Sequence, residues 1–96
     1  MLNKRFITFE GGEGSGKSTQ IKILKNKLSK KNKVIITREP GGTKEAELIR
    51  NLLVKGKPNK WSGITEVLLN FTARKDHVDK IILPNLKKGK WVLCDR

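Results

Sequence analysis

The chain reads GGEGSGKS from Gly11 to Ser18, one residue after an apolar run at residues 6–9. This spacing of glycines, lysine and serine is that of a Walker A phosphate-binding loop. Glycines let the backbone bend until successive N–H groups point at phosphate oxygens, and a helix starting near Lys17 adds the positive end of its dipole. The stretch predicts a loop that binds ATP or GTP through Gly11, Gly12, Glu13, Gly14, Ser15, Gly16, Lys17, Ser18 and Thr19.

The rest of the chain alternates between strand-like and helix-like patterns. Short apolar runs predict strands at residues 6–9, 34–36 and 91–94. Apolar residues at helical spacing predict helices at residues 17–30, 45–54 and 65–81, with Thr65 as the N-cap of the third. Pro84 is expected to end or kink this third helix. The order strand, helix, strand, two helices, strand predicts an α/β fold of the P-loop NTPase type, in which helices flank a parallel sheet.

A carboxylate follows the last apolar run. Asp95 follows Val92, Leu93 and Cys94, which is the arrangement of a Walker B aspartate. Carboxylate and hydroxyl oxygens suit Mg²⁺, so we expect Ser18 and Asp95 to hold this ion with the nucleotide phosphates.

Charge and composition restrict the partners. The net charge is +13, yet the lysines concentrate around one predicted helix and its exit, at Lys22, Lys25, Lys27, Lys30, Lys31 and Lys33. Such lysines solvate a helix, and a chain with no Tyr, three Phe and two Trp offers no platform for base stacking, which argues against nucleic acid as a partner. No apolar stretch reaches the length of a membrane span. The single Cys94 cannot form an internal disulfide, which favours a cytoplasmic setting.

Four further motifs carry a resemblance to a known family. They are Phe9-Glu10-Gly11 before the loop, TREPGGT at residues 37–43, a helix with Glu66, Arg74 and His77, and the terminal VLCDR. In this order they resemble the thymidylate kinase family, over essentially the whole chain but only the family's N-terminal portion. The resemblance implies transfer of the γ-phosphoryl group of ATP to dTMP. Residues 1–96 would then be a single N-terminal part of a nucleoside monophosphate kinase domain, without lid or C-terminal part and therefore inactive alone.

The resemblance also implies residue roles. Lys17, Glu13 and Arg96 would be catalytic, Mg²⁺ would accompany ATP, and the full-length protein would be a homodimer. The dTMP-binding residues would be Glu13, Glu39, Arg50, Arg74 and Arg96. Guanidinium groups suit this task because their planar fork binds phosphate oxygens bidentately. Glu39 would orient neighbouring arginines.

The sequence departs from the family pattern at two places. Asn70 stands where the family commonly has an aromatic residue that stacks on thymine, and Phe71 is its neighbour. The loop also lacks the arginine that one branch of the family carries. The altered stacking position keeps open the alternative of another nucleoside monophosphate kinase. The missing lid and C-terminal part keep open that of a nucleotide-binding remnant without catalysis. His77, the single histidine, is expected to be structural or to face solvent, and Cys94 to be a small buried strand residue.

Overall fold

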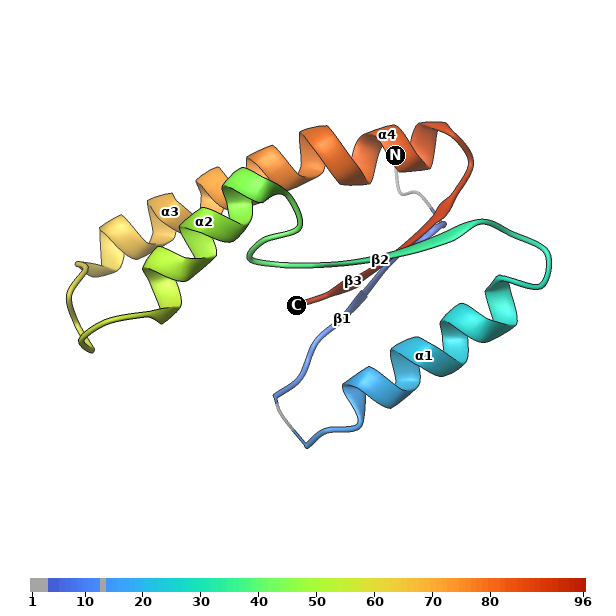
Figure 1. Ribbon diagram of the computed structural model, residues 1–96, viewed down its shortest axis with the longest axis horizontal. Helices are drawn as coiled ribbons and strands as arrows, with labels where there is room; N and C mark the ends of the chain where they lie inside the picture. Colours follow the sequence, from blue (N-terminus) through green and yellow to red (C-terminus); the bar gives the residue numbers. More distant parts are fainter. Residues whose placement is uncertain (1–3, 13) are drawn as a thin grey trace.

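The computed structural model describes residues 4–12 and 14–96, and within these ranges three strands form one parallel sheet. The strands are β1 (Phe6–Phe9), β2 (Val34–Arg38) and β3 (Trp91–Asp95), and β3 lies between the other two. Phe9 and Arg38 both pair with Asp95, so all three strands end at the same edge (Figure 1). This is the expected parallel α/β sheet of P-loop type.

The helices lie on both sides of this sheet. In Figure 1, α1 (Lys17–Leu28) lies below the strands, while α3 (Gly63–His77) leads into a long helical path above them. The helix α2 (Lys44–Val54) lies beside α3. The path from α3 continues through η1 (Val78–Ile82) and α4 (Leu83–Lys87) into β3.

The core is centred on the middle strand. Val92, Leu93 and Cys94 of β3 are fully buried, as expected for a strand with a neighbour on each side. Ile82 and Leu86 pack with Val92 into a cluster under the helical path. The buried strand β3 therefore holds Asp95 at the edge of the sheet with little freedom.

Two expectations about the third helix are corrected. Its N-cap is Ser62, not Thr65: the Ser62 hydroxyl accepts a hydrogen bond from the Thr65 N–H at 3.1 Å. Ser62 takes this role because its backbone is extended while Thr65 already has helical neighbours. Of the two outcomes expected at Pro84, an end or a kink of the helix, the end is not found, because the helical path continues through α4. Pro84 lies in the first turn of α4, directly after the π-helical turn η1, and such a wider turn accommodates the missing N–H of proline.

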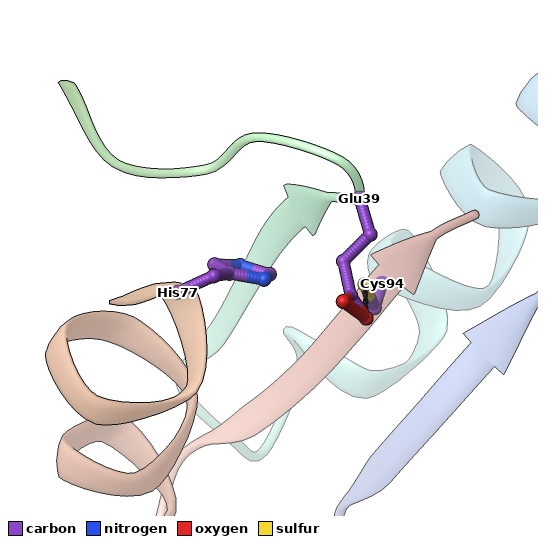
Figure 2. A group of neighbouring side chains, drawn as sticks. All are labelled: Glu39, His77 and Cys94. Atoms are coloured by element: carbon purple, nitrogen blue, oxygen red, sulfur yellow. Dashed lines mark hydrogen bonds between the residues drawn. The ribbon is translucent and has the colours of Figure 1, made fainter. Parts of the chain in front are cut away.

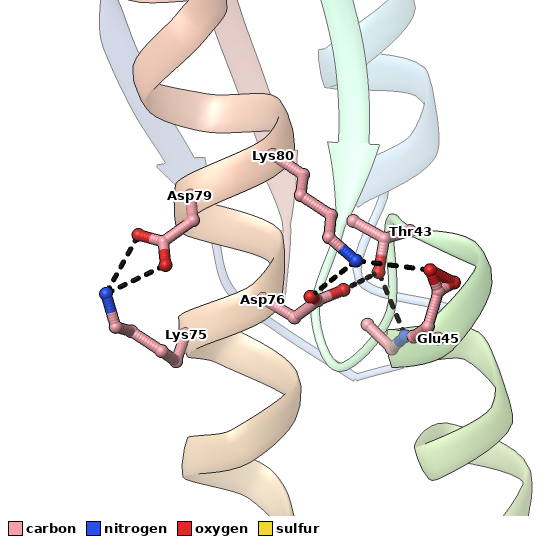
Figure 3. Close-up of polar contacts among 7 residues, drawn as sticks. Thr43, Glu45, Lys75, Asp76, Asp79 and Lys80 are labelled. Carbon is pink, nitrogen blue, oxygen red and sulfur yellow. Dashed lines mark hydrogen bonds and ion pairs between the residues drawn. The ribbon is translucent and has the colours of Figure 1, made fainter.

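A polar network joins α2 to the helical path (Figure 3). The Thr43 hydroxyl accepts from the Ala46 N–H at 2.9 Å, which caps α2, and donates to the Asp76 carboxylate. Lys80 bridges Asp76 at 2.8 Å and Glu45 at 3.1 Å. Lys80 and then Thr43 lower the pKa of the Asp76 carboxyl. The start of α2 is thereby fixed against the end of α3.

Across the described residues, the helices are too short or too polar to span a membrane.

Candidate functional site

The strands end in a cavity of about 420 Å³. One wall is formed by the loop after β1 and the start of α1, namely Gly12, Gly14, Gly16, Lys17, Ser18 and Thr19. The rest of the lining comes from residues that end β2 and β3 or come after them, namely Arg38, Glu39, Arg50, Asp95 and Arg96. Since the carboxyl ends of parallel strands are where such folds bind ligands, this is the candidate active site.

The predicted loop has the geometry of an anion-binding turn. Gly16 is the N-cap of α1 and has φ +81°, a conformation that favours glycine. The Ser15 N–H donates to the Gly12 carbonyl at 3.3 Å, which closes the turn before the helix. Gly11 does not line the cavity but offers its carbonyl to Lys17, and Ser15 does not line it either. Glu13 lies outside the described residues.

The Lys17 side chain contacts both its own loop and the end of β3. Its Nζ donates to the carbonyls of Gly11 and Arg96, each at 2.9 Å, and lies 2.6 Å from the Asp95 Oδ1. The side chain is only 19% exposed. The structure therefore brings the Walker A lysine and the carboxylate of β3 into direct contact.

Ser18 and Asp95 offer only oxygen donors to the same cavity. Hydroxyl and carboxylate oxygens are the ligands that hard divalent cations prefer, so this pair fits Mg²⁺ and not a softer metal.

Glu39 lies between two of the predicted arginines. Its Oε2 is 2.9 Å from the Arg74 Nε, and its Oε1 is 3.8 Å from the Arg96 Nε. A second carboxylate, Glu10, lies 3.4 Å from the Arg96 Nη1. These four residues, with Pro40 and Asn70, line a hollow of about 270 Å³ that shares Glu39 and Arg96 with the larger cavity. Arg74 thus belongs to this second hollow and not to the wall of the first.

Arg50 is held by the loop between β2 and α2, and Arg38 is held by Glu47 of α2. Arg50 Nη1 donates to the Pro40 carbonyl at 3.1 Å. Arg38 Nε donates to the Glu47 Oε2 at 3.1 Å, and its Nη2 pairs with the Glu47 Oε1. The Gly42 N–H also donates to Glu47, at 2.8 Å. The hydrogen bonds from Arg38 first and then from Gly42 lower the pKa of the Glu47 carboxyl to about 2. In turn, the hydrogen bond to Glu47 raises the pKa of Arg38.

Glu39 of the cavity lining also forms a cluster with His77 and Cys94, and the possible ligand atoms of the three side chains lie within 4.8 Å of one another (Figure 2). The Cys94 thiol lies 3.9 Å from the Glu39 Oε1, and burial followed by the Glu39 charge raises the thiol pKa to about 12. A protonated thiol is a poor nucleophile and metal ligand, and the Glu39 charge already faces two arginines. We interpret the cluster as structural, with Glu39 as the member that contacts Arg74 and Arg96.

Sequence reasoning missed several residues of the site. Glu10 was named only within the Phe9-Glu10-Gly11 motif and was given no role, although it faces Arg96. Arg38 was given no role of its own in the sequence analysis, yet it lines the main cavity. His77 is fully buried, which excludes the solvent-facing alternative, and Thr37 is its partner. Arg38 and His77 stand inside or near the TREPGGT and Arg74-x-x-His77 motifs, so their spacing was the available signal.

Comparison with known proteins agrees with this geometry. The family model for Thymidylate kinase matches residues 9–96. Thymidylate kinase from Caulobacter vibrioides is 55% identical over 92 residues, covering 95% of this chain and 44% of the relative. The same enzyme from Nitrobacter hamburgensis is 55% identical over 97 residues, covering 100% of this chain and 42% of the relative.

A solved structure gives the same result. The crystal structure of thymidylate kinase from Ehrlichia chaffeensis matches with a TM-score of 0.82 at 47% identity, over 95% of this chain and 50% of that one. The chain thus spans half or less of the length of these relatives. Because the family model covers nearly the whole chain, the chain belongs to the thymidylate kinase family.

Proposed function

We propose that the protein transfers the γ-phosphoryl group of ATP to dTMP, giving dTDP and ADP. The observation that supports the proposal is a pair of adjoining hollows that share Glu39 and Arg96. One is lined by the Walker A residues, and the other by Arg74 and Arg96, which suit a second phosphate. Two adjoining phosphate-binding sets are what transfer between two nucleotides requires, since catalysis of this reaction is mainly positioning and charge neutralisation.

On the donor wall, the backbone N–H groups from Gly11 to Thr19 would bind the β- and γ-phosphates. Lys17 would neutralise them, and its present partner Asp95 would be released by this exchange. A binding nucleotide therefore replaces one ion pair by another and leaves neither charge unpaired.

Mg²⁺ would be held by Ser18 and Asp95, whose oxygens line the same cavity. When bound, this ion would neutralise part of the charge on the phosphates. Lys17 and Asp95 are then separated but both remain paired.

The acceptor monophosphate would be bound by Arg50 of the larger cavity, Arg74 of the smaller hollow and Arg96, which lines both. Glu39 would orient Arg74 and Arg96, which it contacts at 2.9 and 3.8 Å. Arg96 is placed between the two hollows, so it would also stabilise the group in transfer. Glu13 would contact the acceptor sugar or a group linked to the metal. No covalent enzyme intermediate is needed.

We further propose that the protein is a cytoplasmic homodimer that packs through α2 and α3. These helices lie side by side and expose large apolar side chains that water does not favour. The exposed residues are Leu48, Leu52, Ile64, Val67, Leu68 and Phe71. Light scattering at several protein concentrations tests the dimer, and a monomer at every concentration would contradict it.

A different nucleoside monophosphate is the second candidate for the acceptor, and Asn70 favours it. This amide lines the acceptor hollow, and its Nδ2 donates to the Glu66 carbonyl at 2.9 Å. Phe71 lies next to Arg74, with the guanidinium 6.0 Å from the ring, and does not line the hollow. An amide cannot stack on a base as an aromatic ring does.

The deciding experiment extends this chain to the length of its relatives and compares kcat/KM for dTMP, dUMP, CMP and AMP with Mg·ATP as donor. We expect dTMP to give the highest value. A preference for CMP or AMP would refute the thymidylate assignment while leaving the nucleotide-binding loop intact.

A further inference from the structure

The His77 side chain is fully buried although it is polar. It projects from the last residue of α3 toward the end of β2 (Figure 2). Its Nε2 is 2.5 Å from the Thr37 hydroxyl oxygen, while its Nδ1 has no hydrogen-bond partner in the described part of the chain. Burying a polar ring with one nitrogen unsatisfied costs free energy, so the position of the ring needs a compensating role.

The loop after β2 closes tightly over this contact. Gly42 has φ +96°, and a Cβ built there would lie 2.5 Å from the His77 Nε2 and 2.8 Å from the Thr37 hydroxyl. Both distances are shorter than van der Waals contact, so only glycine fits. The loop that carries Glu39, Pro40 and Gly42 is therefore packed closely against both partners of the Thr37–His77 hydrogen bond.

A second contact joins the same two elements. Glu39 follows Thr37 by two residues, and Arg74 precedes His77 by three, which places both helical residues on one face of α3. The 2.9 Å ion pair between Glu39 and Arg74 thus runs beside the bond between Thr37 and His77. The inner bond joins the fully buried His77 to the half-buried Thr37, whereas the Arg74 side chain is 44% exposed.

The hydrogen bond between Thr37 and His77 restricts where the ion pair between Glu39 and Arg74 can form. An arginine that is half exposed has many rotamers, and its ion pair alone holds the helix weakly. A buried hydrogen bond one turn away keeps the backbone of Arg74 at a constant distance from the end of β2. The hollow lined by Glu39, Arg74 and Arg96 then keeps its shape before any ligand binds.

We propose that His77 is a positioning residue of the acceptor site. Through its hydrogen bond to Thr37, it sets the place where Arg74 meets Glu39 and the acceptor phosphate. The inference rests on the proposed function, because it takes a nucleoside monophosphate as the ligand of this hollow.

The test removes each end of the buried bond and compares two ligands. Thr37→Val removes the hydroxyl and keeps the shape, and His77→Leu removes the imidazole. The matched control is Val78→Ala, which trims a neighbouring half-buried side chain that packs on the core cluster. Calorimetric titration measures the dissociation constants of dTMP and ATP for each protein, and thermal melts measure stability.

We expect Thr37→Val and His77→Leu each to weaken dTMP about tenfold, because small misplacements of a binding group have effects of this size. ATP affinity should stay within about twofold in both, since neither residue belongs to the loop wall. The double variant should lose no more than either single variant, because both act through one bond. In turnover, KM for dTMP should rise while kcat changes little.

A purely structural role would give a different result. If Val78→Ala, at an equal loss of melting temperature, weakens dTMP as much as Thr37→Val does, the proposal is wrong. It is also wrong if dTMP and ATP weaken in parallel. Should His77→Leu fail to fold, Thr37→Val carries the test alone. If the wild-type protein binds CMP or AMP in place of dTMP, the proposed function fails, and the same comparison is made with that nucleotide.

Discussion

Replacing Lys17 by alanine should weaken Mg·ATP binding by about 30- to 140-fold. The Lys17 ammonium lies 2.6 Å from the Asp95 carboxylate and is only 19% exposed, so its charge is held at the cavity wall by the protein. A charge-assisted hydrogen bond contributes about 1.5–3 kcal/mol. In the variant, Asp95 would also face the phosphates without a cation, which favours the upper part of that range. A loss of about 2–3 kcal/mol corresponds to the stated factor.

The assay is calorimetric titration of folded protein with Mg·ATP, and Lys22→Ala is the matched control. Lys22 lies on the same helix, is exposed, and has no ion pair within the described ranges. The two variants lose the same charge, so any general effect of net charge appears in both. The control should bind within about twofold of the wild type. The reasoning is refuted if Lys17→Ala binds like the wild type, or if both variants lose affinity equally.

Three other variants test separate parts of the site. Arg74→Ala should weaken dTMP binding by about tenfold or more and leave ATP binding unchanged in titrations, because it removes a charge-assisted contact in the smaller hollow only. Equal losses of affinity for both ligands would contradict this placement. Gly42→Ala should lower the melting temperature by roughly 10 °C, corresponding to about 2 kcal/mol, since the new methyl group overlaps His77; an unchanged melting curve would show that the loop is not tightly closed. Glu47→Gln should destabilise the protein above pH 4.5, and the stability gap to the wild type should close as pH falls toward about 2, because the pKa of this carboxyl is lowered from 4.5 to about 2 by Arg38 in the folded state. If denaturation measurements show the same stability difference between the two proteins throughout this pH range, the ion pair between Glu47 and Arg38 does not stabilise the fold.

The elements and the loop follow closely from local sequence patterns. The strand at residues 6–9 and the helix beginning at Lys17 were predicted from apolar spacing and from the glycines between them, and the structure has them there. Patterns of this kind depend on neighbours within about one turn. The same local evidence could not choose between Ser62 and Thr65 as the N-cap, because both residue types cap helices and they stand one turn apart.

The long-range contacts were beyond such patterns. The order of the strands, with β3 between β1 and β2, depends on how helices fill both faces of the sheet. The bond between Thr37 and His77 joins residues 40 apart, and a lone histidine gives no periodic signal of burial. The pairing of Lys17 with Asp95 was also absent from the sequence analysis, which assigned each residue to a ligand and not to the other.

The central claim is phosphoryl transfer from ATP to dTMP. Its most direct measurement is ³¹P NMR of a mixture of Mg·ATP, dTMP and a protein in which this chain is extended to the length of its relatives, because the signals of dTDP, ADP and free phosphate identify every product. The account predicts that dTDP and ADP appear in equal amounts and that no free phosphate accumulates. Production of ADP and free phosphate without dTDP, or binding of ATP with no turnover at all, would contradict it.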